Sequence, residues 1–156
     1  MISLAWTRFF LVAAGLFGAV GVAAGAYASH GLARLVDEVK LIEYFELAAL
    51  YQLLHAVALL GLALAASYRP LHLGAVIAGL LFTAGVFLFS GSLYLRVLTG
   101  VPDWGALTPL GGSAFILGWL VIATTGVRAT QALQAGPEQK PGHQTAEGPQ
   151  GLRPPQ

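Results

Sequence analysis

The sequence predicts an all-α fold, an integral membrane bundle of four transmembrane helices. Hydrophobic residues make up 56% of the 156 residues and charged residues only 10%, whereas soluble domains carry roughly 25% charged residues. Four runs without a charged residue follow one another along the chain. Each run can cross the roughly 30 Å of bilayer hydrocarbon as an α-helix, which rises about 1.5 Å per residue.

The predicted spans are residues 9–29, 47–67, 73–95 and 110–127. Arg69 and Pro70 follow the second span, Arg96 closes the third and Arg128 closes the fourth. We therefore treat residues 1–134 as one four-helix transmembrane domain.

The first span also resembles a signal peptide, because Arg8 and an apolar run precede the A-x-A pattern of Ala26, Tyr27 and Ala28. Signal peptides have apolar regions of roughly 7 to 15 residues, and the run in this chain is longer. We expect a retained helix, and a cleaved signal peptide is the alternative.

Two segments outside the spans have their own character. Residues 31–46 place charged and apolar residues at a helical period, which predicts a short amphipathic helix in the membrane interface or at the mouth of the bundle, running into the second span. A solvated, partly helical loop is the alternative.

Residues 135–156 are rich in proline, glycine and polar residues, and such segments bury too little apolar surface to become ordered. We expect a disordered C-terminal tail.

Small residues indicate where the helices approach closely, because helix association in lipid depends on van der Waals packing and a few interhelical hydrogen bonds. The predicted packing residues are Gly18, Gly21, Gly25, Gly91, Gly111 and Gly112. Such a face can meet another helix of the chain or a second copy. A homo-oligomer and an unidentified membrane partner therefore both stay open, in addition to the lipid bilayer.

The charge balance excludes nucleic-acid binding. Eight basic and seven acidic residues leave a net charge of +1, which is not the concentrated positive field that nucleic acids require. The chain also contains no cysteine, which excludes disulfides, thiolate nucleophiles and cysteine-ligated metals.

Four spans place both termini on one side of the membrane. That side carries Arg8, Arg69, Arg128, Lys140 and Arg153, and the other side carries Arg34, Lys40 and Arg96. Because basic residues concentrate on the cytoplasmic side, we expect cytoplasmic termini.

The polar residues of the spans gather in one half of the predicted membrane. In an antiparallel bundle the end of the first span, the start of the second, the end of the third and the start of the fourth meet one surface. The candidate polar cluster there consists of His30, Tyr51, Gln52, His55, Ser90, Ser92, Tyr94 and Thr108. His55 lies roughly 12 Å below that surface, with Tyr51 and Gln52 one turn above it on the same face.

Two interpretations of this cluster stay open. In the first, the side chains hydrogen-bond one another and hold the helices together. In the second, neutral His55, helped by Gln52, Tyr94 and His30, binds a ligand or relays protons. A metal site would depend on two histidines alone, so we expect no metal and no cofactor. The sequence lacks GxSxG, HExxH and a phosphate-binding glycine loop, so we expect no catalytic residue.

Four segments together resemble a known family. They are FGAVGVAAGAYASHGL (17–32), YQLLHAVALLGLA (51–63), LFSGSLYL (88–95) and TPLGGSAFILGW (108–119). In this order they resemble the YgdD-like family of small bacterial inner-membrane proteins, whose eukaryotic relatives are called transmembrane protein 256. The resemblance implies four membrane helices and no reaction, since the family is a domain of unknown function. Its recurring residues coincide with the candidate cluster and add Gly91, Pro109, Gly111 and Gly112.

These observations predict a small, non-enzymatic membrane protein, a structural or accessory factor that packs with itself or with a partner complex. One alternative is a homo-oligomeric transporter or channel for small solutes or protons, built around His55. A second alternative is a binding site for a lipid or a quinone-type ligand.

Overall fold

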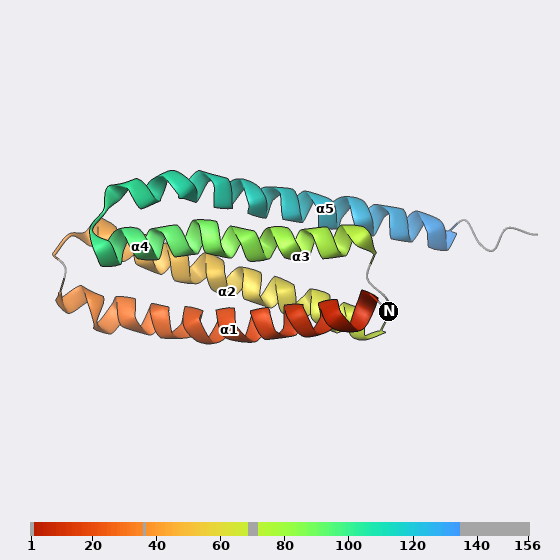
Figure 1. Cartoon of the computed structure of the whole chain (residues 1–156), viewed down its shortest axis with the longest axis horizontal. Helices are drawn as coiled ribbons and strands as arrows, with labels where there is room; N and C mark the ends of the chain where they lie inside the picture. Colours follow the sequence, from red (N-terminus) through yellow and green to blue (C-terminus); the bar gives the residue numbers. More distant parts are fainter. Residues whose placement is uncertain (1, 36, 69–71, 135–156) are drawn as a thin grey trace, which may run out of the picture.

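A computed structural model describes residues 2–35, 37–68 and 72–134, which form an elongated helical bundle (Figure 1). Its elements are α1 (Ile2–His30), η1 (Leu32–Arg34), α2 (Val39–Tyr68), α3 (Leu73–Gly85), η2 (Val86–Gly91), α4 (Ser92–Thr99), η3 (Pro102–Leu107) and α5 (Thr108–Gln134). η1 and η3 are short 3-10 helices, and η2 is a π-helical segment. α3, η2 and α4 follow one another without a break as the third long helix. These three ranges contain no strand.

Neighbouring long helices run antiparallel (Figure 1). α1 packs along α2, and α5 packs along α3. η1 and η3 lie at the end of the bundle where α1 ends and α5 begins, which we call the η1/η3 end. The start of α1 and the end of α5 lie together at the opposite end.

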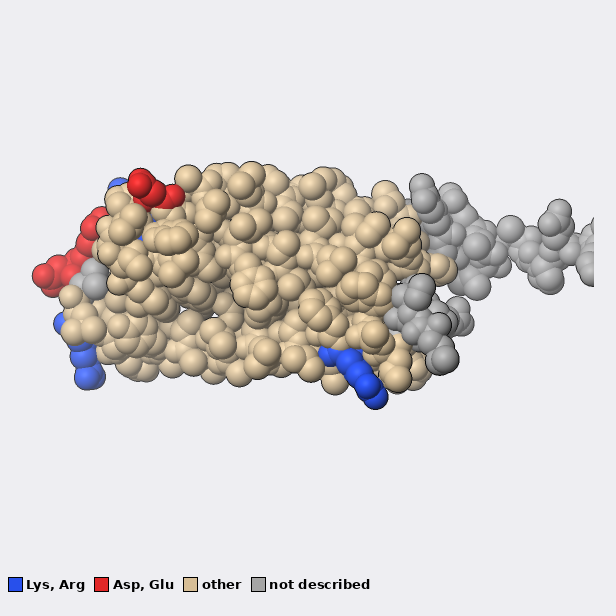
Figure 2. Space-filling model, in the orientation of Figure 1, with Lys and Arg blue, Asp and Glu red and all other residues tan. Residues whose placement is uncertain are grey.

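Within the described ranges, four helical stretches are long and apolar enough to cross a membrane. They are Leu4–Arg34, Val39–Tyr68, Leu73–Thr99 and Pro102–Thr125. On the face seen in Figure 2, charged side chains lie near the two ends, and the long side between them carries none. Large apolar side chains such as Leu16, Val57 and Ile116 are exposed along the bundle. Lipid is the solvent that favours such a surface, so the predicted four-span all-α fold is confirmed.

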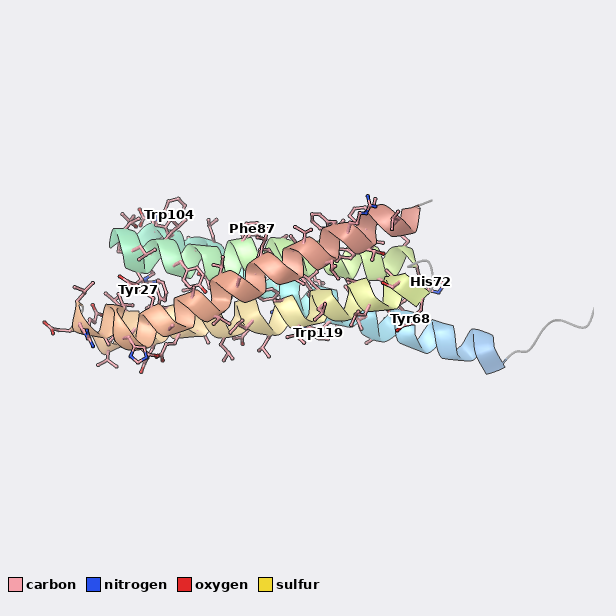
Figure 3. All side chains as sticks on the ribbon, turned by 90° about the horizontal axis from the view of Figure 1, so that it is seen from below. Tyr27, Tyr68, His72, Phe87, Trp104 and Trp119 are labelled. Carbon is pink, nitrogen blue, oxygen red and sulfur yellow. The ribbon has the colours of Figure 1, made fainter. Side chains whose placement is uncertain are left out.

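Aromatic side chains lie toward both ends of the bundle. Tyr27 and Trp104 lie toward the η1/η3 end, and Tyr68 lies near the other end beside His72 (Figure 3). Tyrosine and tryptophan prefer the headgroup level, where their polar edge reaches water and their ring stays in the apolar region. Their positions agree with the ends of the bundle lying at the two membrane surfaces.

The helices are longer than the predicted spans. α2 begins at Val39 rather than at residue 47, because charged side chains near a helix end reach toward water and do not interrupt the backbone hydrogen bonds. Residues 31–46 therefore divide into the short η1 and the first turns of α2, which run directly into the second span. The predicted tail, residues 135–156, lies outside the described residues.

α3 and α5 pack through two reciprocal pairs of an aromatic ring and a glycine. Phe82 of α3 lies against Gly118 of α5, where an added Cβ would come 2.5 Å from the ring. Phe115 of α5 lies against Gly85 of α3 in the same way. Both rings are almost completely buried. Each glycine thus makes room for a ring that a larger residue would displace.

Two of the predicted packing glycines lie at close contacts. A Cβ on Gly21 of α1 would come 2.8 Å from Cγ of Leu53 on α2. A Cβ on Gly111 of α5 would overlap the backbone nitrogen of Phe89 and come 2.8 Å from the carbonyl carbon of Leu88. The second contact is the more restrictive, because backbone atoms of η2 cannot move aside as a side chain can.

The other predicted packing glycines have more room. The nearest atom to an added Cβ is 3.9 Å away at Gly91 and 3.8 Å away at Gly112, which are ordinary contact distances. A Cβ on Gly18 or Gly25 would meet nothing within 4 Å.

Gly111→Ala should destabilise the bundle, whereas Gly112→Ala should change its stability little. The first substitution forces α5 away from the backbone of η2, and overpacking of this kind costs about 1–3 kcal/mol. Thermal unfolding of both variants in the same mild detergent measures the difference. Equal melting temperatures for the two variants would contradict the close approach of α5 and η2.

Candidate functional site

His55 lies on α2 and reaches α5. Its Nδ1 donates a hydrogen bond to the backbone carbonyl of Tyr51 at 2.8 Å. Its Nε2 accepts a hydrogen bond from Nε1 of Trp119 at 3.3 Å. An indole nitrogen can only donate, so this pattern requires a neutral imidazole with its proton on Nδ1. Both ring nitrogens therefore have partners inside the chain.

The faces of the imidazole are also occupied. The ring stacks on Phe115, with centroids 3.6 Å apart and an angle of 11° between the planes. Phe82 lies 5.2 Å from it, centroid to centroid, and Tyr51 stacks on Phe89 at 4.6 Å. His55 is only 4% exposed. It is thus a member of an aromatic core cluster.

Gln52 forms a contact between α2 and α1. It is 3% exposed, and its Nε2 donates a 2.7 Å hydrogen bond to the backbone carbonyl of Phe17 on α1. A Cβ at Gly21 would lie 3.6 Å from the same Nε2, so the small residue lets the amide approach the α1 backbone. Gln52 therefore ties α2 to α1, while His55 ties α2 to α5.

A third polar contact joins the start of α4 to the start of α5. Oγ of Ser92 donates to the carbonyl of Phe89 at 2.9 Å and lies 2.8 Å from Oγ1 of Thr108. Since the serine has a single proton, Thr108 is the donor in the second bond. The pair fixes α5 against the third long helix where α5 begins.

Two buried hydroxyls lack partners within the described chain. Oγ of Ser90, in η2, and Oη of Tyr94, one turn further on, make no hydrogen bond. Ser90 is completely buried. The Tyr94 ring packs on Phe45 at 4.7 Å, in a second core cluster nearer the η1/η3 end. Because neither hydroxyl has a partner, this is the part of the core whose polar groups are least satisfied. Ser90 also lies in a π-helical segment, and such segments often occur at functional sites.

The candidate residues thus form several separate contacts. Tyr51 and His55 share the aromatic cluster, Gln52 bonds to α1, and Ser92 bonds to Thr108. His30 is exposed at the end of α1. The described residues contain no group of three histidines or carboxylates that could hold a metal ion.

The sequence analysis missed Trp119, the side chain that hydrogen-bonds His55. Figure 3 shows it near the middle of the bundle, and it is half exposed to the surroundings. A signal was available, because Trp119 lies about nine residues inside the predicted fourth span, roughly 13 Å deep at 1.5 Å per residue. That depth matches the roughly 12 Å predicted for His55.

The fold and these contacts define a four-span α-helical membrane protein whose helices are joined by buried aromatic and polar contacts. Comparison with known proteins places it more narrowly. A family model described as "Protein of unknown function (DUF423)" matches residues 24–112. The chain belongs to this family.

Several bacterial proteins are similar to the chain over most of their length. A UPF0382 membrane protein of Staphylococcus aureus is 36% identical over 119 residues, which cover 75% of this chain and 95% of that protein. YwdK of Bacillus subtilis is 34% identical over 122 residues, 78% of this chain and 98% of YwdK. YgdD of Escherichia coli K12 is 33% identical over 122 residues, 78% of this chain and 92% of YgdD. No solved structure matches the chain.

These relatives confirm the predicted family and location. The Staphylococcus and Bacillus proteins are named UPF0382 membrane proteins, and YgdD is named an inner membrane protein. The chain is accordingly a multi-pass integral membrane protein of the inner membrane. Cytoplasmic termini stay a prediction.

Ser90→Ala should leave the free energy of unfolding unchanged or raise it, whereas Ser92→Ala should lower it by about 1 kcal/mol. The first change removes a buried hydroxyl without a partner, and the second leaves Oγ1 of Thr108 without one. Equilibrium unfolding in lipid bicelles measures both. A larger loss of stability for Ser90→Ala than for Ser92→Ala would contradict the absence of a partner at Ser90.

Proposed function

We propose that this protein is a non-catalytic structural or accessory factor of the membrane, and that its buried polar side chains serve to fix the helix packing. The hydrogen bonding of His55 is the observation that supports this most. A histidine that relays protons or binds a ligand needs a free nitrogen at some stage. Both nitrogens of His55 have partners within the chain, and Phe115 covers one face of the ring.

The distribution of interhelical hydrogen bonds also supports a packing role. Gln52 joins α2 to α1, His55 joins α2 to α5, and Ser92 joins the third long helix to α5. Each contact connects a different pair of helices. Such a set determines which helices are neighbours, as is expected of residues that hold a bundle together in lipid.

A proton relay has less support. The acidic residues of the described chain are Asp37, Glu38, Glu43, Glu46 and Asp103. All five lie toward the η1/η3 end of the bundle. None of them makes a described contact with His55. In the part of the chain that the structure describes, His55 therefore has no carboxylate as a hydrogen-bond partner.

His55→Ala should lower the free energy of unfolding by about 2–5 kcal/mol, the range for removal of a large buried side chain. Trp119→Phe keeps an aromatic ring beside Phe82 but removes the hydrogen bond, whose loss should cost about 0.6–1.7 kcal/mol. The double variant should lose less than the sum of the two, because both changes break the same bond. Unfolding of the four proteins in bicelles measures this coupling.

The same variants test the proposal against the relay. Wild-type protein and His55→Ala, reconstituted in vesicles under a pH gradient, should show the same proton leak as empty vesicles. A flux that is present with the wild type and absent with His55→Ala would overturn the packing role.

An accessory role also requires a surface for a second chain, and we propose the open face of α1. Gly15, Gly18 and Gly25 lie on one side of this helix together with Val22, and a Cβ on any of the three glycines would meet nothing within 4 Å. Faces of small residues allow close helix contacts in lipid. A second copy or another membrane protein would pack there.

A photo-crosslinking amino acid at Val22 should capture a second copy or another membrane protein in intact cells. The same amino acid at Ile116 of α5 should capture only lipid. The two positions are matched, because Val22 is 64% and Ile116 63% exposed. Gly18→Leu with Gly25→Leu should abolish the product at Val22. Identical products at both positions would contradict the assignment of this face.

A further inference from the structure

Two hollows of the surface meet at the η1/η3 end. A polar hollow of about 340 Å³ lies between the start of α2 and the end of α4, where Glu38 and Lys40 line it. An apolar groove of about 350 Å³ runs between α2, α4 and α5 along Leu47 and Leu93. Tyr44 and Arg96 line both. The polar hollow and the apolar groove therefore adjoin each other at Tyr44 and Arg96.

Arg96 is fixed in position without being neutralised. The carbon of its guanidinium group lies 4.9 Å from the centroid of the Tyr44 ring. A Cβ on Gly105 would come 2.6 Å from Nη1 of Arg96, so the absence of a side chain there leaves room for the guanidinium. Within the described chain, no carboxylate lies at ion-pair distance from Arg96, and Glu38 has no cationic partner. An oriented cation and an unpaired anion thus share one hollow.

The depth of these residues fits a membrane surface. Arg96 lies three residues before Thr99, the last residue of α4, which places it about 5 Å below the helix end. Phe89, at the far end of the groove, lies about 10 Å deeper than Arg96. The charged hollow is thus near the headgroup level, and the groove extends into the hydrocarbon.

The charges of this end favour a headgroup that carries both signs. Acidic residues outnumber basic ones here: Asp37, Glu38, Glu43, Glu46 and Asp103 against Arg34, Lys40 and Arg96. The negative field of this end repels a purely anionic headgroup. A headgroup with a phosphate and an ammonium group matches both Arg96 and Glu38.

We propose that the protein binds one molecule of phosphatidylethanolamine at this surface. The phosphate oxygens accept hydrogen bonds from Arg96, with Lys40 as a second cation. The ammonium group donates to the carboxylate of Glu38. One acyl chain lies along Leu47 and Leu93 in the groove. This site depends neither on His55 nor on the open face of α1, so it stands independently of the proposed packing role.

Native mass spectrometry of the protein, released from nanodiscs that contain equal amounts of phosphatidylethanolamine and phosphatidylglycerol with identical acyl chains, tests the site. The wild type should retain mainly phosphatidylethanolamine. Arg96→Gln should lower this retention about fivefold, because one basic residue near a membrane surface is worth about 1 kcal/mol. Arg34→Gln is the matched control, since Arg34 belongs to the same end but lines neither hollow, and it should retain lipid as the wild type does.

Two further variants test the ammonium contact and the groove. Glu38→Gln should shift the retained lipid toward phosphatidylglycerol, because the partner of the ammonium group is lost. Gly112→Leu should fill the groove that Gly112 lines and lower the retention of both lipids without changing their ratio. A melting temperature near that of the wild type establishes that the Leu variant is folded, and Gly112→Ala provides a smaller substitution with the same expected direction.

Several outcomes would overturn this site. Equal retention of the two lipids by the wild type, or a preference for phosphatidylglycerol, would contradict the role of Glu38. If Arg96→Gln and Arg34→Gln lowered the retention of phosphatidylethanolamine equally, the general charge of this end, and not a contact with Arg96, would explain the retention. A wild-type protein that retains no lipid would exclude a lipid as the occupant of the groove.

Discussion

The structure depends on one constraint: a polar group in hydrocarbon finds no water and must find its partner within the chain. Most hydroxyls of the spans meet it locally. Ser67 and Thr83, for example, donate to the backbone carbonyl four residues earlier. Gln52, His55 and Ser92 instead reach neighbouring helices. Because their partners are on other helices, these three residues join different pairs of the four spans.

Close approach of the helices is what lets those bonds form. His55 can stack on Phe115 because the Phe115 ring lies against Gly85, and the reciprocal pair of Phe82 and Gly118 holds the same two helices at the same separation. In lipid, helix pairing brings no hydrophobic gain. The van der Waals packing of these rings must therefore stabilise the pairing of α3 and α5. The glycines of α3 and α5 therefore make room for the aromatic rings that pack between these helices.

The sequence predicted the four spans, because they follow from hydropathy and from a rise of about 1.5 Å per residue. It did not predict the rotation of each helix. Gln52 and His55 share one face of α2, as expected for residues three apart, but the sequence did not indicate that they bond to α1 and α5 respectively. Rotation is set by which ring lies on which glycine, and by η2, whose longer hydrogen-bond period moves Ser90 and later residues around the helix. A single sequence contains no direct signal for either.

The two halves of the bundle differ in how far their polar groups are satisfied. Around His55 the partners are complete, whereas Ser90, Tyr94 and the unpaired Arg96 all lie nearer the η1/η3 end. The contact of Ser92 with Thr108 joins the two helices that form walls of the apolar groove. Arg96 belongs to α4 and itself lines that groove, so the same helix contacts place its guanidinium group there. The contact of Ser92 with Thr108 therefore helps to shape the groove of the proposed lipid site, although that site does not require the packing role proposed for His55.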